Sequence, residues 1–113
     1  MDELDWVEEY PAAVTVCDRE GVIVAMNARS CATFEAQGGR SLVGRSLLDC
    51  HPGESKEKLK RLLASPSTNV YTIEKKGIKK LVYQSPWFKD GQYAGIVELS
   101  LPIPFEMPHF VRG

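Results

Sequence analysis

The stretch that decides the fold is Ala13–Pro52, AVTVCDREGVIVAMNARSCATFEAQGGRSLVGRSLLDCHP. It opens with two short runs rich in β-branched residues, Val14–Cys17 and Val22–Met26. Residues of this kind favour strands, and the polar, glycine-ending tetrapeptide Asp18–Gly21 between the runs suits a tight turn. We therefore expect an antiparallel hairpin at the start of the fold.

A helix is expected directly after this hairpin. Asn27 follows the second strand, and its side-chain oxygen can accept hydrogen bonds from the free N–H groups of a helix start. We predict that Asn27 caps a helix over residues 28–36. A second, amphipathic helix is predicted over Glu54–Ser65, because leucines recur there three and four residues apart among Lys and Glu, and Pro66 ends the pattern.

Three further strands are predicted after the second helix, over Asn69–Lys76, Ile78–Phe88 and Gln92–Leu101. Gly77 and the tripeptide Lys89–Gly91 supply the turns between them. The order of elements is then β-β-α-α-β-β-β. This order predicts an α+β domain, a five-stranded antiparallel sheet with helices packed on one face.

Three features of the first half occur in an order and spacing that resemble the PAS family. They are Asn27 at the helix start, the glycine of Leu42–Arg45, and the pair His51-Pro52. The resemblance covers residues 12–101. It implies a sensory or signal-transduction domain that binds a small ligand in a pocket between sheet and helices, or that mediates protein–protein interaction. A pure dimerisation module with a filled core is the first alternative.

Composition fits one domain that is not an enzyme. The 113 residues are 43% hydrophobic and 26% charged with a net charge of −1, which gives no long-range attraction to nucleic acid or to a membrane surface. No apolar run is long enough to span a membrane, so we expect a cytoplasmic protein. We find no catalytic motif and no metal-binding spacing among Cys17, Cys31 and Cys50.

The two ends are expected to differ from the central domain. Residues 1–11 predict an amphipathic helix, Asp2–Tyr10, and residues 102–113 form a proline-rich tail that cannot continue as a helix. We expect a homodimer through the outer sheet face and the N-terminal helix, because Leu4, Val7 and Ile96 are left outside in this scheme. The tail disfavours direct helical coupling to an output domain, so a separate signalling partner is the better hypothesis.

The candidate pocket residues come partly from strand alternation and partly from the resemblance. Alternation places Tyr93, Val97 and Leu99 on one face of the last strand, and the PAS resemblance implies that Val97 faces the pocket. Tyr71 and Tyr83 could orient a ligand through their hydroxyl groups. The cofactor-binding candidates are Phe34, Cys50, His51, Tyr71, Tyr83, Val97 and Leu99. The cofactor itself is left unknown.

A second alternative is a small haem or thiol redox protein centred on Cys50 and His51. A thiolate and an imidazole can ligate iron, or the imidazole can activate the thiol. Two known PAS cofactor modes fit this chain poorly. Leu47 stands where the flavin-adduct type has its reactive cysteine, and the predicted helix Glu54–Ser65 lacks the proximal histidine of the oxygen-sensing haem type. A structural role for the Cys50-His51 pair, as a turn between helices, remains open.

Overall fold

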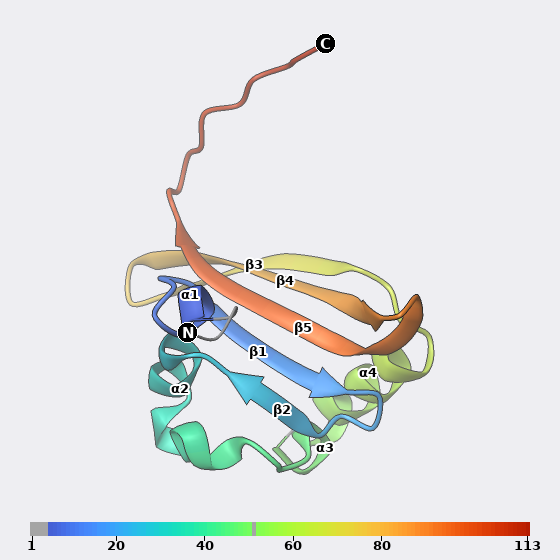
Figure 1. Ribbon diagram of the computed structural model, residues 1–113. Coiled ribbons are helices and arrows are strands. Elements are labelled where there is room, and N and C mark those ends of the chain that lie inside the picture. Colours follow the sequence, from blue (N-terminus) through green and yellow to red (C-terminus); the bar gives the residue numbers. More distant parts are fainter. Residues whose placement is uncertain (1–4, 51) are drawn as a thin grey trace.

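The computed structural model describes residues 5–50 and 52–113, without the side chain of Cys50. Five strands form one antiparallel sheet in the order β2-β1-β5-β4-β3 (Figure 1). The strands are β1 Ala13–Asp18, β2 Ile23–Met26, β3 Asn69–Lys75, β4 Ile78–Lys89 and β5 Gln92–Ile103. The helices are α1 Asp5–Glu8, α2 Ala28–Thr33, α3 Leu47–Cys50 and α4 Gly53–Ala64, with 3₁₀ turns η1 Glu35–Gln37 and η2 Gly39–Leu42. The predicted α+β class and five-stranded sheet are confirmed.

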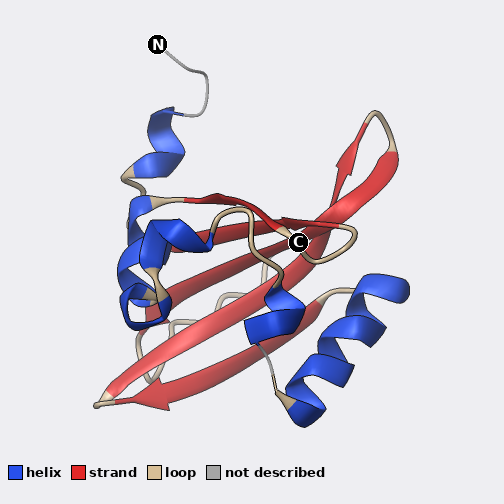
Figure 2. Ribbon diagram, turned by 90° about the horizontal axis from the view of Figure 1, so that it is seen from below, coloured by secondary structure: helices blue, strands red, loops and turns tan. Residues whose placement is uncertain are grey.

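The helices α2, α3 and α4 lie on one face of the sheet (Figure 2). Two apolar clusters fix them there. Cys17 and Ile96 of the sheet pack with Leu63 of α4, and Ile23 and Met26 pack with Leu42 of η2. Ile96 is only 5% exposed, so the expectation that it lies on the outside of the sheet was wrong. Of the other residues expected outside, Val7 is half-buried and Leu4 lies outside the described residues.

The β1–β2 hairpin forms as predicted. One carboxylate oxygen of Asp18 accepts from the backbone N–H groups of Glu20 and Val22, both at 3.0 Å. Gly21 adopts a φ of +85°, a conformation that costs a side-chain-bearing residue free energy. The turn is therefore stabilised by a local carboxylate and by the one residue type that tolerates this backbone.

Asn27 caps α2 as predicted. Its backbone is extended, and its Oδ1 accepts a hydrogen bond from the backbone N–H of Ser30 at 3.0 Å. The helix itself is shorter than the predicted 28–36 range, because α2 ends at Thr33 and η1 continues the chain. No helix in the described part of the chain is long and apolar enough to cross a membrane.

Strand β5 departs from regular alternation at a β-bulge. Trp87 of β4 pairs with Gly95, whereas the next residue, Phe88, pairs with Tyr93, so Ala94 is an extra residue on β5. A bulge of this kind exchanges the faces of the residues on its two sides. Tyr93 and Ile96 consequently both point toward the helices, and the hydroxyl of Tyr93 donates to the backbone oxygen of Leu63 at 3.0 Å.

The end of β5 also differs from the prediction. The strand continues two residues beyond the expected Leu101, to Ile103, because Lys79 and Lys80 of the long β4 still supply backbone partners for Ile103 and Pro102. From Pro104 onward the chain forms no helix or strand, bends at Phe105 and Glu106, and leaves the domain (Figure 1). The predicted absence of a helix in the tail agrees with this course.

Candidate functional site

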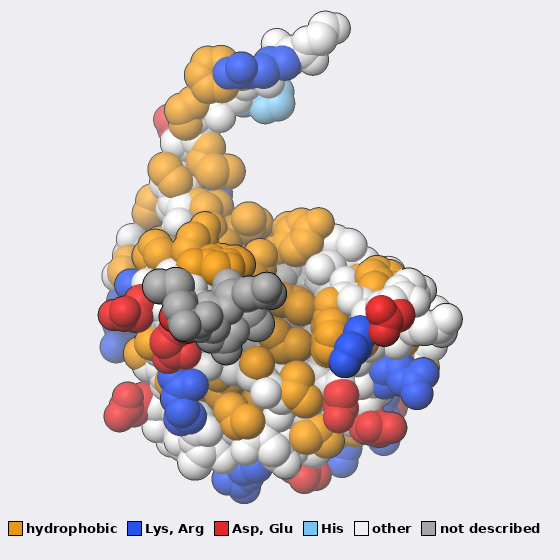
Figure 3. Space-filling view, in the orientation of Figure 1, with side chains coloured by type: hydrophobic (Ala, Val, Ile, Leu, Met, Phe, Trp, Pro, Cys, Tyr) orange, Lys and Arg blue, Asp and Glu red, His pale blue; other side chains and the backbone are white. Residues whose placement is uncertain are grey.

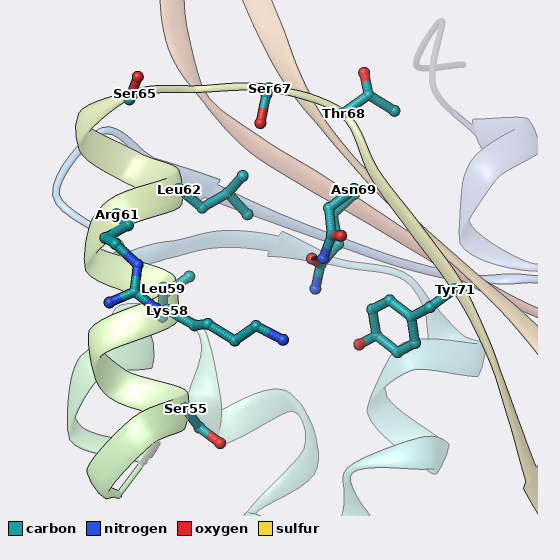
Figure 4. A pocket seen from close by; sticks show the side chains of 11 residues that line it. Ser55, Lys58, Leu59, Arg61, Leu62, Ser65, Ser67, Thr68, Asn69 and Tyr71 are labelled. Carbon is teal, nitrogen blue, oxygen red and sulfur yellow. Dashed lines mark hydrogen bonds between the residues drawn. The ribbon is translucent and has the colours of Figure 1, made fainter.

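A cleft of about 710 Å³ opens between α4 and strand β3 (Figure 4). The helix contributes Ser55, Lys58, Leu59, Arg61 and Leu62; the following loop contributes Ser65, Ser67 and Thr68; the sheet contributes Asn69, Tyr71 and Gln84. The volume is within the range of small-molecule sites. The cleft is therefore large enough for a ligand and opens to solvent along its helix and edge-strand rims.

The polar groups of the cleft come from facing walls. Tyr71 points from β3 toward α4, and the Lys58 side chain extends from α4 toward β3 (Figure 4). Deeper on the sheet wall, the side-chain amide of Asn69 donates to Oε1 of Gln84 at 2.9 Å across the β3–β4 pair. Cationic, amide and phenol groups thus surround one space, over an apolar floor that includes Leu59 and Leu62.

A second, small cavity of about 40 Å³ adjoins this cleft. It shares Leu59, Leu62 and Gln84 with the cleft and extends inward along the sheet. Its other lining residues are Thr15, Cys17, Leu47, Ile96 and Glu98. At this size it holds about one water molecule, so the interior next to the cleft is almost filled.

Two titratable groups of this region have raised pKa values. Burial raises the pKa of the Tyr71 phenol, and the nearby Glu98 carboxylate raises it further. Burial also raises the pKa of the Cys17 thiol, with smaller contributions in the same direction from Asp18 and Glu98. Both groups are therefore neutral at pH 7. Cys17 is a packing residue with a poorly nucleophilic thiol, and Tyr71 can donate a hydrogen bond.

The candidate residues of the sheet separate onto two faces. Tyr71 lines the cleft, as expected. Val97, Leu99 and Tyr83 do not, because they share the face opposite to Ile96, Cys17 and the helices. The orientation of Val97 toward the pocket, which the PAS resemblance implied, was wrong, as was that of Leu99, which shares its face. The bulge at Ala94 also separates Tyr93 from that face, where regular alternation had placed it.

The other candidates lie away from the cleft or outside the described part of the chain. Phe34 packs against the cluster of Ile23, Met26 and Leu42 beneath α2, where it completes the core. The side chain of Cys50 and the whole of His51 lie outside the described residues, so the haem or thiol hypothesis for this pair stays a prediction. Among the residues that are described, no group of three His, Cys, Asp or Glu side chains could hold a metal ion.

Sequence reasoning missed the polar cleft residues Lys58, Asn69 and Gln84, and Glu98 of the adjoining small cavity. A signal for part of this set was present. A two-residue turn at Lys76-Gly77 fixes the β3–β4 register, which places Asn69 opposite Gln84 and Tyr71 opposite Val82. Counting residues along both strands from this turn would have placed Asn69, Tyr71 and Gln84 on the same face of the sheet, and so on one wall of the cleft.

The face of the sheet opposite the helices carries a continuous apolar patch, here called the outer face. Neighbouring strands align Val14 with Leu99 and Tyr83, and Val16 with Val97. Leu101 and Leu81 extend the patch toward the tail. Hydrophobic side chains gather on the upper part of the domain and along the tail, whereas charged side chains dominate below (Figure 3). Exposed apolar area of this extent commonly marks an interaction surface.

Comparison with known proteins identifies the family. The sequence profile of the PAS fold matches residues 7–65, more than half of the chain. The chain belongs to the PAS family. PAS membership confirms the resemblance seen in the sequence and makes the domain a sensory or signalling module, with no catalytic family found. No curated protein sequence matches the chain.

Solved structures, among them PAS domains, share the fold of this domain at low sequence identity. A PAS domain of an HTR-like protein from Haloarcula marismortui is 20% identical, with a TM-score of 0.58 over 87% of this chain and 91% of that one. The PAS domain of Bordetella pertussis BvgS is 18% identical, with a TM-score of 0.63 over 87% and 81%. A C-terminal domain from Streptococcus mutans reaches a TM-score of 0.69 at 17% identity, over 85% and 78%. At these identities the likeness concerns the fold.

Proposed function

We propose that this PAS domain is a sensor that binds a small polar molecule in the cleft between α4 and β3, and that a separate partner reads the bound state. The observation that carries the proposal is the convergence of Lys58, Tyr71 and the Asn69–Gln84 amide pair on one space of about 710 Å³. Few, well-placed polar groups over an apolar floor are typical of small-molecule sites.

The charges at the cleft favour an anionic ligand. Lys58 and Arg61 stand on the helix wall, and Tyr71 adds a neutral hydroxyl donor. Carboxylates and phosphates accept hydrogen bonds from these donors, and the amides of Asn69 and Gln84 can bind polar groups further in. Apolar parts of the ligand would lie on Leu59 and Leu62. We therefore place small organic acids and phosphorylated metabolites first among the candidates.

Two tyrosines provide a matched test of the cleft. Tyr71 and Tyr83 are 43% and 39% exposed, but only Tyr71 lines the cleft. A library of small carboxylic acids and phosphate esters is screened by thermal shift, and each hit is titrated by calorimetry. Tyr71→Ala should weaken binding by about tenfold, the loss of one good hydrogen bond and its ring contacts, whereas Tyr83→Ala should change it by less than about twofold. Equal effects of both variants would contradict binding in the cleft.

We further propose that the outer face mediates homodimerisation. Its aligned apolar side chains are half-buried or exposed, and a second copy would cover them with an identical patch. Ile96 was expected in this interface, but it lies in the core. Val14, Val97 and Leu99 are therefore proposed as the central contacts of the interface. The half-buried Val7 of α1 remains a candidate for the edge of this interface.

A charge at the centre of the outer face tests the dimer. Leu99→Asp should weaken self-association in sedimentation equilibrium, because it would bury an unpaired carboxylate in an apolar interface. Val43→Asp is the control: Val43 is also exposed, but it lies in the loop between η2 and α3. Circular dichroism checks that both variants fold. A wild-type chain that stays monomeric at high concentration would overturn the proposed interface.

A further inference from the structure

The tail beyond Ile103 has two sides of different backbone chemistry. In an extended chain, successive residues direct their N–H groups to opposite sides. Both prolines of this segment, Pro104 and Pro108, occupy even-numbered positions, as does Pro102 just before it in β5. Proline has no N–H, so the even side of the tail lacks two of its donors, whereas every odd-numbered residue from Phe105 onward keeps its donor. Once it straightens at the bend of residues 105–106, the tail can thus form a continuous ladder on one side only.

Most odd-numbered positions carry apolar side chains. The odd-numbered residues are Ile103, Phe105, Met107, His109 and Val111; of these, Phe105, Met107 and Val111 are exposed apolar residues, Val111 by 90%. On the even side, the guanidinium of Arg112 lies over the ring of Phe110, 5.6 Å from its centroid, as expected for alternate residues of an extended chain. Glu106 and His109 are the two ionisable residues in 104–111. A segment so apolar does not have the composition of a solvated linker.

The tail has almost no partner in its own domain. The amine of Lys79 donates to the backbone oxygen of Phe105 at 3.5 Å, and beyond this point the tail points away from the body (Figure 1). Strand β4 cannot extend the ladder, because it begins at Ile78, where the chain turns into β3. The tail is therefore an apolar segment that keeps the N–H groups of its odd-numbered residues but has no neighbouring strand in its own domain.

One sheet edge of the domain is open to such a segment. The sheet ends in β2 and β3. The edge of β2 is already used by residues 44–45, since Ile23 donates to the oxygen of Arg45 and accepts from the N–H of Gly44. All seven residues of β3 are exposed, among them Val70 and Ile73, and alternate residues of an edge strand direct unpaired backbone groups outward.

We propose that residues 104–111 add as a strand to the β3 edge of a second copy of this chain. The donor side of the tail matches the open edge in backbone chemistry, in its apolar character and in length, eight residues against seven. The prolines then lie on the far side and stop a further strand from joining. Since each chain holds both a donor and an acceptor, reciprocal exchange closes a two-fold dimer. This interface is separate from the cleft and from the outer face.

The two sides of the tail give matched variants. Met107→Pro removes an N–H from the pairing side, whereas Glu106→Pro removes one from the far side; Met107→Ala removes the side chain and keeps the N–H. Hydrogen exchange of the full-length chain is followed at low and high protein concentration for peptides covering Asn69–Lys75 and the tail. In the wild type and in Glu106→Pro, both segments should exchange more slowly at high concentration.

Met107→Pro should shift the protection of Asn69–Lys75 to about tenfold higher protein concentration, the equivalent of one lost ladder bond. Met107→Ala should retain the protection, in weakened form. Equal behaviour of the two proline variants would overturn the proposal. It would also be overturned by protection of Ile23–Met26 instead of Asn69–Lys75, or by protection that appears only when another protein is added. A protection that survives Leu99→Asp would support an interface independent of the outer face.

Discussion

Gly95→Ala is expected to destabilise the domain by at least about 4 kcal/mol, which is a large part of the roughly 5–15 kcal/mol of stability typical of a folded domain. A Cβ at this position would stand 1.9 Å from the backbone oxygen of Cys17 and 2.8 Å from the Cα of Asp18, both rigid backbone atoms of the neighbouring strand. The φ of +149° is also unfavourable for any residue with a side chain. The bulge of β5 therefore requires glycine for two reasons.

Gly91→Ala provides the control for this variant. Gly91 also has a positive φ, +78°, but no atom lies within 4 Å of the position of its Cβ. Gly91→Ala should lower the free energy of unfolding by about 1 kcal/mol, the cost of the backbone conformation alone. Urea unfolding can be followed by the fluorescence of Trp87, whose indole N–H donates to the same Cys17 oxygen at 2.9 Å. Similar midpoints for the two variants would show that β5 does not approach β1 as closely as described.

Asn27→Ala is expected to cost about 3 kcal/mol, more than the roughly 1 kcal/mol of an ordinary N-cap. The side chain of Asn27 is 3% exposed and makes four hydrogen bonds. Its Oδ1 accepts from the N–H groups of Val14 and Ser30, and its Nδ2 donates to the backbone oxygens of Ala12, at 2.8 Å, and Val7, at 2.9 Å. Alanine would leave several of these backbone groups buried and unpaired.

The same substitution at Asn69 is the control. Asn69 is exposed and hydrogen bonds with one side chain, that of Gln84. Asn69→Ala should change the free energy of unfolding by less than about 0.5 kcal/mol. Asn27→Ala should in addition loosen α1, which Asn27 holds through the oxygen of Val7, so faster exchange of the amides around Tyr10 is expected. If Asn27→Ala lowers the free energy of unfolding by only about 1 kcal/mol, the helix cap accounts for the whole contribution of Asn27, and its other hydrogen bonds do not add to stability.

The fold was predictable from the sequence because its signals are local. The Asp18–Gly21 turn, the Asn27 cap and the leucine spacing of α4 each depend on residues a few positions apart, and the structure contains all three. These signals fix the order of the elements. The order of strands and helices, together with the motifs around Asn27 and Gly44, then led to the PAS family.

The candidate site was predicted less well because it depends on strand facing. The PAS resemblance implied that Val97 faces the pocket, and Leu99 shares its face, but both point away from the helices. One extra residue, Ala94, also reverses the face of Tyr93 relative to these two residues. A glycine inside a strand often marks a bulge, so Gly95 is the residue from which an interruption of the strand alternation could have been predicted. The cleft also depends on how far α4 stands from β3. That distance is set by packing across the whole domain, which no local pattern encodes.

Whether the cleft is a ligand site is tested most directly by native mass spectrometry of the protein purified without unfolding. The protein should carry an additional small mass that is released on denaturation. The mass should be retained in Tyr83→Ala and lost or greatly reduced in Tyr71→Ala, because only Tyr71 faces the cleft. If the wild type shows the mass of the chain alone, and no carboxylic acid or phosphate ester of the library shifts its melting temperature, the sensor proposal is contradicted. The PAS domain would then be an interaction module.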